Sequence, residues 1–237
     1  MNGEAVIEVC EIFGPTIQGE GALLGLPTIF VRTGGCDFRC RWCDTPYAVD
    51  PAFRRHWTAM TATEIFAEVR HLSGDRPLTV SLSGGNPALQ PLDGLIAMGR
   101  AAGYRFALET QGSVARPWFA QLEVLIISPK PPSSGMDCDR AALAAAIEAA
   151  GGAAVSLKFV VHDDDDYAFA REVASCFPRL PVCLQPCNDK PRLPGRRGEM
   201  DLERLRRLIA KTLSDGWYEA RVLPQLHVLL WGNERGR

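Results

Sequence analysis

The residues of this chain that are best suited to chemistry are three cysteines in the segment Cys36-Asp-Phe-Arg-Cys40-Arg-Trp-Cys43. Three thiolates in one short loop can hold a single metal centre. A structural zinc ion takes four protein ligands, usually with a second cysteine pair at similar spacing, and the sequence contains no such pair. A four-iron cluster on three thiolates leaves one iron open to bind a substrate. The segment therefore predicts a metal centre with an open coordination site. The alternative is a zinc ion that is bound by the three cysteines and by His56 as the fourth ligand.

The composition excludes several classes of function. The formal net charge of −2 gives no broad positive surface for DNA, RNA or anionic lipid. No apolar run approaches the length that spans a bilayer, and the N-terminus lacks the basic-then-apolar pattern of a secretory signal. We therefore expect a cytoplasmic protein without nucleic-acid or membrane partners, whose eight cysteines are thiols or metal ligands rather than disulfides.

Apolar, β-branched runs alternate with helical patterns along the chain, as in parallel strands joined by crossover helices. The predicted strands are Thr28–Thr33, Leu78–Leu82, Arg105–Glu109, Val124–Ile127, Ala154–Val161, Pro181–Gln185 and Glu219–Leu223. The predicted helices are Thr63–Leu72, Leu92–Ala102, Arg140–Ala150, Tyr167–Cys176 and Leu202–Leu213. Such an alternation forms a full or partial α/β barrel or a doubly wound sheet, and both place ligands at the carboxyl ends of the strands. We expect one domain over residues 1–237.

Polar segments follow the predicted strands at the edge where ligands bind. They are Ser83-Gly84-Gly85-Asn86-Pro87, Thr110-Gln111-Gly112, Ser128-Pro129-Lys130, Gln185-Pro186 and Pro224-Gln225-Leu226-His227. Because the carboxyl ends of parallel strands meet at one edge, we expect these segments to share one cleft. The acidic run Asp163–Asp166 directly precedes a helical pattern, so helix capping is its expected role rather than cation binding.

The CxxxCxxC spacing after the first predicted strand and the downstream turn Gly84-Gly85-Asn86-Pro87 together resemble the radical S-adenosylmethionine superfamily. That resemblance implies a partial, incomplete parallel α/β barrel. It also implies a 4Fe-4S cluster on Cys36, Cys40 and Cys43, whose open iron binds S-adenosyl-L-methionine. The glycine turn would meet the amino group of this cofactor, because glycine lets backbone carbonyls approach closely. Many members have a glutamate at the position of Asn86, so this turn keeps an acceptor oxygen and loses a charge.

Further motifs extend over nearly the whole chain. They are Glu11-Ile-Phe-Gly-Pro-Thr-Ile-Gln18-Gly19-Glu20-Gly21, Phe30-Val-Arg32, Cys43-Asp44-Thr45-Pro46, Glu109-Thr-Gln-Gly, Ser128-Pro-Lys-Pro, Leu184-Gln185-Pro186 and Pro224-Gln225-Leu226-His227. This set resembles the family of 7-carboxy-7-deazaguanine synthases of queuosine precursor biosynthesis. The resemblance implies a carbon–nitrogen lyase that contracts the ring of 6-carboxy-5,6,7,8-tetrahydropterin to 7-carboxy-7-deazaguanine and releases ammonia. It also implies Mg²⁺, a flavodoxin- or ferredoxin-type electron donor and a homodimer.

The same resemblance assigns roles to individual residues by matching motif. The cofactor S-adenosyl-L-methionine would contact Trp42, Cys43, Asp44, Gly85, Ser128, Pro129, Lys130, Gln185, Pro186, Cys187 and Asn188. The pterin would contact Ile17, Gln18, Gly19, Glu20, Arg32 and Ser83. Arg32 would clamp its carboxylate and Glu20 would accept hydrogen bonds from its donors. Thr45 would give its hydroxyl to Mg²⁺, which takes its other oxygens from substrate and water. For His227 we expect a structural role first and a substrate role second.

Two other functions share part of this pattern. A radical activase, which installs a glycyl radical on a partner protein, would have the same cluster and glycine turn. It would need a large protein-docking surface, whereas this chain offers a small polar set at Gln18, Glu20, Arg32 and Thr45. A noncatalytic zinc-binding module would explain the cysteines alone. Iron and sulfide in the anaerobically purified protein would distinguish a cluster from zinc.

Overall fold

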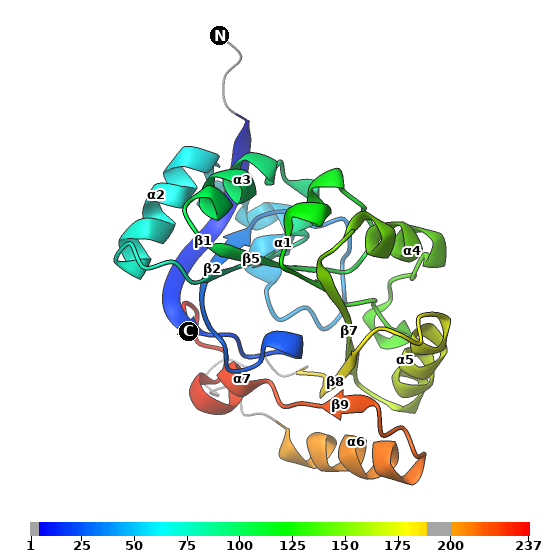
Figure 1. Cartoon of the computed structure of the whole chain (residues 1–237). Helices are drawn as coiled ribbons and strands as arrows, with labels where there is room; N and C mark the ends of the chain where they lie inside the picture. The colour runs from blue at the N-terminus through cyan, green and yellow to red at the C-terminus, as the bar shows by residue number, and fades with distance from the viewer. Residues whose placement is uncertain (1–4, 189–200) are drawn as a thin grey trace.

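The computed structural model describes residues 5–188 and 201–237. They form one curved sheet of nine strands with helices packed against it (Figure 1). The strand order is β3-β1-β2-β4-β5-β6-β7-β8-β9. Strand β2 and strands β4 to β9 are parallel, and β1 runs antiparallel to both β2 and β3. The strands are β1 Val6–Ile17, β2 Pro27–Thr33, β3 Thr58–Thr61, β4 Thr79–Gly84, β5 Arg105–Thr110, β6 Val124–Ile127, β7 Ala154–Val161, β8 Val182–Pro186 and β9 Ala220–Val222.

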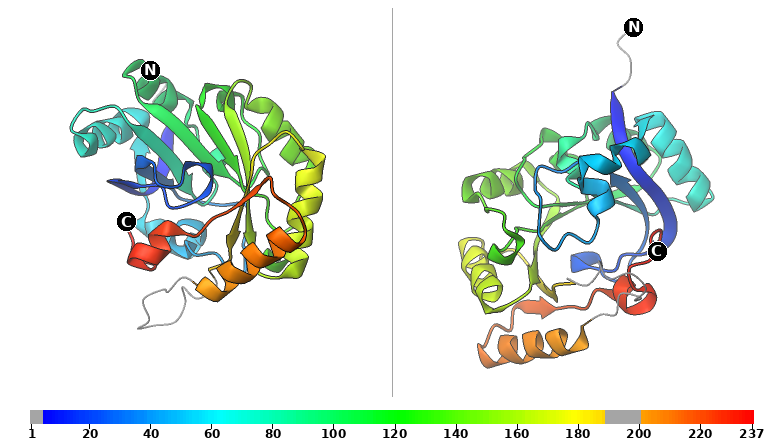
Figure 2. Two further views of the ribbon diagram at one scale, coloured as in Figure 1. Left: turned by 60° about the horizontal axis from the view of Figure 1, so that its bottom comes forward. Right: turned by 180° about the vertical axis from the view of Figure 1, so that it is seen from behind.

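The larger helices cover the outer face of this sheet, as Figure 2 shows. Helix α2 packs on β1 and β2, α3 on β5, α5 on β7, and α6 on β8 and β9. The sheet ends in β3 on one side and β9 on the other, so the barrel is not closed. The prediction of an incomplete parallel α/β barrel is confirmed. The helices are α1 Pro46–Val49, α2 Ala62–Ser73, α3 Asp93–Ala101, α4 Arg140–Ala149, α5 Asp164–Cys176, α6 Leu202–Ser214 and α7 Leu226–Trp231.

Alternation along the strands separates a hydrophobic core from a polar interior. On β7, Leu157 and Phe159 are fully buried in the hydrophobic core, which includes the apolar faces of the outer helices, whereas Lys158 and Val160 line a cavity on the other face. Gln185 on β8 reaches the same cavity. The core therefore lies between the sheet and the outer helices, and its largest fully buried side chains include Phe106, Phe119 and Phe159.

The predicted strands and longer helices are present, and the structure adds β1, β3, α1 and α7. Strand β1 contains Gly14 and Pro15, which are typical turn residues in a sequence. Its register with β2 shifts between Phe13 and Thr16, and such an irregularity tolerates a proline that lacks an N–H donor. The segment Pro224-Gln225-Leu226-His227 follows the last strand as predicted, and it leads into α7. No helix of the described residues is long and apolar enough to cross a membrane.

Candidate active site

A cavity lies at the carboxyl ends of the parallel strands and is also lined by the loop after β1 and by α7. Predicted site residues that line it are Ile17, Gln18, Gly19, Glu20, Arg32, Cys36, Cys40, Trp42, Cys43, Asp44, Thr45, Ser83, Gly85, Ser128, Lys130, Gln185 and Asn188. Three predicted cofactor contacts, Pro129, Pro186 and Cys187, lie outside this lining. The fold thus brings residues from both predicted ligand sites into one space.

The three cysteines lie in the loop between β2 and α1, and all three line the cavity as free thiols. Burial raises the pKa of each thiol, that of Cys40 to about 11. Iron that binds here must therefore displace the thiol protons. Within the described part of the chain, no three Cys, His, Asp or Glu side chains converge on one ion position. The three thiols lie near enough to affect the pKa of one another, as thiols that would hold one cluster must.

The second half of the cysteine loop is held from outside by the loop after β6. The indole Nε1 of Trp42 donates to Ser133 Oγ at 2.8 Å, and Ser133 Oγ donates to Asp166 Oδ2 at 2.6 Å. The backbone N–H of Arg41 donates to the Ser134 carbonyl at 2.9 Å. Asp163 caps α5 as predicted, but Asp166 is fully buried and anchors this contact instead. The acidic run therefore does more than capping, because one member positions the cluster loop.

The first half of the cysteine loop is fixed through Asn86. This side chain is fully buried and is absent from the cavity lining. Its Nδ2 donates to Asp37 Oδ1 at 2.9 Å, and its Oδ1 accepts from Thr110 Oγ1 at 2.8 Å. Gln111 Nε2 also donates to Asp37 Oδ1, at 2.5 Å, and lies 3.8 Å from Cys36 Sγ. The acceptor oxygen of Asn86 is thus used within the protein, which leaves the glycine backbone to face a cofactor.

The glycine turn packs directly on the start of the cysteine loop. A Cβ atom on Gly85 would lie 2.0 Å from the carbonyl oxygen of Gly35, a distance that no side chain can occupy. The backbone N–H of Asn86 donates to that same carbonyl at 2.8 Å. Glycine is therefore required here for the close approach of two backbone segments.

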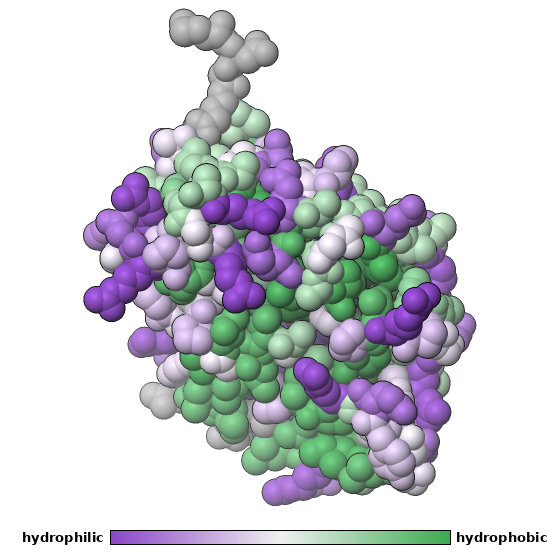
Figure 3. All heavy atoms as spheres, viewed as in Figure 1, coloured by the Kyte–Doolittle hydropathy of each residue, from purple (hydrophilic) through white to green (hydrophobic). Residues whose placement is uncertain are grey.

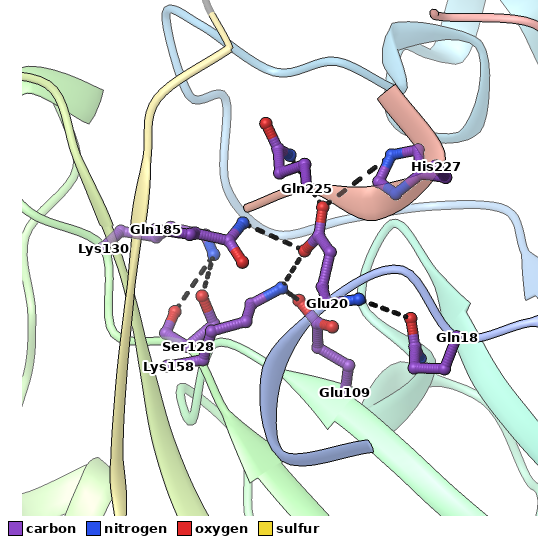
Figure 4. Close-up of polar contacts among 9 residues, drawn as sticks. All are labelled: Gln18, Glu20, Glu109, Ser128, Lys130, Lys158, Gln185, Gln225 and His227. Atoms are coloured by element: carbon purple, nitrogen blue, oxygen red, sulfur yellow. Dashed lines mark hydrogen bonds and ion pairs between the residues drawn. The ribbon is translucent and has the colours of Figure 1, made fainter. Parts of the chain in front are cut away.

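At the other end of the cavity Glu20 is surrounded by donors (Figure 4). Its Oε2 accepts from Lys158 Nζ and from Gln185 Nε2, the latter at 3.0 Å. Its Oε1 accepts from Gln225 Nε2 at 2.7 Å and lies 3.9 Å from His227 Nε2. Burial alone would raise the pKa of Glu20, but the charge of Lys158 outweighs it and holds this pKa well below its usual range. Glu20 is therefore an ionised acceptor in a fixed orientation.

Arg32 lines the cavity and is held on one side by Glu11. Its Nε donates to Glu11 Oε1 at 2.7 Å, and the Tyr47 hydroxyl donates to the same oxygen at 3.2 Å. Burial opposes the charge of Arg32, but Tyr47 and Glu11 offset it and raise the arginine pKa above its ordinary value. The terminal nitrogens of Arg32 have no hydrogen-bond partner in residues 5–188 and 201–237, so the bidentate edge is available for an anion.

Asp44 and Thr45 join the cysteine loop to the cavity wall. Partial desolvation at the cavity raises the pKa of Asp44, and the nearby charge of Glu20 adds to this rise. The Thr45 hydroxyl does not cap α1 and lies 3.8 Å from Cys43 Sγ. A hydroxyl oxygen is therefore present beside the cysteine loop, where the family resemblance implies Mg²⁺.

Several cavity residues were not among the predicted site residues. Glu109, Lys158 and Gln225 line the cavity, and so does His227, which was expected first as a structural residue. Alternation along β7 was the available signal for Lys158, since its apolar neighbours occupy the opposite face. Glu109 and Gln225 both occur in motifs at strand ends, where ligand contacts are concentrated.

The match to known protein families agrees with this geometry. Residues 30–126 match the model of the Radical SAM superfamily. This match, the incomplete barrel and the three-cysteine loop at the end of its first parallel strand define a radical S-adenosylmethionine enzyme.

Two relatives with high sequence identity narrow this class of enzyme. The chain is 44% identical over 238 residues to the 7-carboxy-7-deazaguanine synthase of Bacillus subtilis. The alignment covers 97% of this chain and 98% of that protein. It is 41% identical over 234 residues to the synthase of Bacillus cereus, with coverage of 97% and 98%. The chain belongs to the family of 7-carboxy-7-deazaguanine synthases. The crystal structure of QueE from Escherichia coli shares its fold, with a TM-score of 0.68, 24% identity and coverage of 94% and 95%.

Proposed function

We propose that this chain converts 6-carboxy-5,6,7,8-tetrahydropterin to 7-carboxy-7-deazaguanine and ammonia, in queuosine and 7-deazapurine biosynthesis. The observation that carries this proposal is that one cavity joins the three thiols to the ionised Glu20 and to the open edge of Arg32. A radical generator and a polar receptor for a small anion are thereby in reach of each other. Identity to named synthases over almost the full chain supports the same reaction.

The cysteine loop has the task of holding the cluster. Cys36, Cys40 and Cys43 would bind three irons, and Gly85, Ser128, Lys130 and Gln185 would hold S-adenosyl-L-methionine beside the fourth. When bound, the cluster supplies the electron that cleaves this cofactor, and the cofactor supplies the radical that removes a hydrogen atom from the substrate. The hydrogen bond from Trp42 to Ser133 would help to hold this loop in place.

The pterin would lie between Arg32 and Glu20. The open edge of the Arg32 guanidinium matches a carboxylate, which accepts two parallel hydrogen bonds. Glu20 accepts hydrogen bonds from the N–H groups of the pterin ring, while Ile17, Gln18, Gly19 and Ser83 complete the wall. The two charged groups therefore fix both ends of a substrate that carries an anion at one end and donors at the other.

A magnesium ion would bind at Thr45 and neutralise charge on the substrate as its ring rearranges. The Thr45→Ala variant is expected to need roughly tenfold more Mg²⁺ for half-maximal rate, the change that follows a loss of about 1.4 kcal/mol in binding. The measurement is product formation during a magnesium titration. Thr58→Ala on the exposed part of β3 is the control. Identical titrations for Thr45→Ala and the unaltered chain would refute the magnesium role.

Three further properties belong to the same proposal. The enzyme would work in the cytoplasm, as a homodimer, and would receive electrons from a flavodoxin- or ferredoxin-type protein. Size-exclusion chromatography with light scattering tests the dimer. Reduction of the cluster by each donor protein, followed by absorbance, tests the electron source.

The experiment that tests the function is an anaerobic turnover assay with the pterin, S-adenosyl-L-methionine and a reductant. Mass spectrometry is expected to detect 7-carboxy-7-deazaguanine and ammonia, and elemental analysis is expected to find iron and sulfide. A brown, iron-loaded protein that cleaves the cofactor but leaves the pterin unchanged would favour the activase alternative. A colourless protein with one zinc ion would refute the radical function.

A further inference from the structure

Lys158 is a buried lysine in the middle of an otherwise apolar strand. Its side chain is only 3% exposed, and it points from β7 into the cavity beside Glu20 and Glu109 (Figure 4). Burying an ammonium group costs free energy unless charged partners compensate. An apolar residue at this position would avoid that cost, so packing alone gives no reason for a lysine here.

Lys158 joins two carboxylates that come from distant parts of the chain. Its Nζ donates to Glu20 Oε2, from the loop after β1, and to Glu109 Oε1, at the end of β5. Burial works against the charge on Lys158, but Glu109 and Glu20 outweigh it and raise its pKa above the ordinary value. The lysine is therefore a permanent cation between two anions, and the three groups together carry one net negative charge.

The remaining acceptor positions of these carboxylates face the cavity. A carboxylate has about four lone-pair positions, and on Glu20 three are taken by Lys158, Gln185 and Gln225. Glu109 uses Oε1 for Lys158, and within the described residues its Oε2 accepts no hydrogen bond. Glu109 lines the cavity with a side chain that is 27% exposed. Each carboxylate thus keeps an acceptor for a ligand, and one lysine fixes the orientation of both.

We propose that Lys158 is a positioning residue, which holds Glu20 and Glu109 as a rigid pair of anionic acceptors for the N–H donors of the substrate ring. The inference rests on the proposed function for the identity of that substrate. Without the lysine the two carboxylates repel each other, so that they separate or share a proton. In either case the receptor for ring donors loses its shape, while the cysteine loop keeps its own supports.

The test compares Lys158→Met with the unaltered chain in the pterin turnover assay. Lys158→Met is expected to raise KM for the pterin by about 10- to 100-fold, the range for losing a hydrogen bond to a charged group. Iron content is expected to stay unchanged, because the cysteine loop is held by Ser133, Asp166 and Asn86 rather than by Lys158. Lys158→Gln keeps a hydrogen-bond donor without the charge. Its KM for the pterin is expected to lie between the values of the unaltered chain and Lys158→Met. Lys211→Met on α6, which removes a half-buried lysine that pairs with Asp215 and is absent from the cavity lining, is the matched control.

A double-variant cycle asks whether the lysine acts through Glu20. Glu20→Gln is expected to raise KM by itself, and adding Lys158→Met is expected to raise it little further, because coupled residues are not additive. A KM within twofold of the unaltered chain, fully additive effects, or loss of fold and iron in both Lys158 variants would overturn the proposal. If the unaltered chain forms 7-carboxy-7-deazaguanine, any of these three results overturns the role of Lys158 and leaves the proposed function standing. No product from that chain would overturn both.

Discussion

The Cys40→Ala variant is expected to lose iron and sulfide and to stop cleaving S-adenosyl-L-methionine. Cys40 is the middle thiol of the loop and lines the cavity with Cys36 and Cys43. With two thiolates left, a second iron of the cluster has no protein ligand, and the cluster has too few anchors to persist. The remaining fold should survive, since the loop lies outside the hydrophobic core. The measurements are iron and sulfide per chain, the absorbance of the cluster, and 5′-deoxyadenosine formed after reduction.

Cys176→Ala provides the matched control, because Cys176 is an exposed thiol at the end of α5. That variant is expected to load iron and to cleave the cofactor as the unaltered chain does. Cofactor cleavage retained by purified Cys40→Ala would contradict the assignment of the cluster ligands. Equal losses in both variants would point instead to general damage from removing a cysteine.

Gly19→Ala is expected to lower kcat/KM for the pterin by about 100-fold, the effect of misplacing binding groups by roughly 1 Å. A Cβ atom at this position would lie 2.3 Å from His227 Nδ1 and 2.9 Å from the His227 backbone nitrogen. Helix α7 begins beside Gly19, whose carbonyl oxygen accepts from Leu226 N at 2.9 Å. The added methyl group must therefore displace α7, and with it the Gln225 amide that orients Glu20. Steady-state kinetics with varied pterin concentration measures the effect.

Iron content and cofactor cleavage without pterin should be unchanged in Gly19→Ala, because within residues 5–188 and 201–237 no backbone hydrogen bond joins this glycine to the cysteine loop. The control is Gly152→Ala, where an added Cβ meets no atom within 4 Å. Wild-type kcat/KM in Gly19→Ala would show that α7 is not needed at the substrate end. A parallel loss of iron would show that the damage spreads beyond that end.

Local patterns in the sequence are sufficient to predict the parallel strands and the cysteine loop. The parallel strands can be predicted from short apolar runs in the sequence. The cysteine spacing predicts the metal-binding loop even when the surrounding structure is unknown. Strand β1 was missed because Gly14 and Pro15 are turn signals when the flanking strand is unknown. Strand β3 is four residues long and has an exposed, polar start, so it carries almost no pattern.

The connections within the site were beyond local patterns. Glu20 and Lys158 are 138 positions apart, and Glu20 and Gln225 are 205 apart, so only the folded sheet brings them together. Alternation gives Lys158 a face of β7, but it does not say whether that face meets solvent or a cavity. Asn86 is a similar case. Its place in a glycine turn does not reveal that its side chain donates to Asp37 inside the protein.

The two ends of the cavity share the central strands but differ in their additional supports. The cluster loop is braced by Ser133 and Asp166, from the central part of the sequence. The receptor around Glu20 is completed by β1 with its following loop and by α7, which flank the run of parallel strands. Mutations in those flanking segments can change which molecule is accepted and leave radical generation intact. Substrate choice and radical chemistry can therefore evolve separately in this architecture.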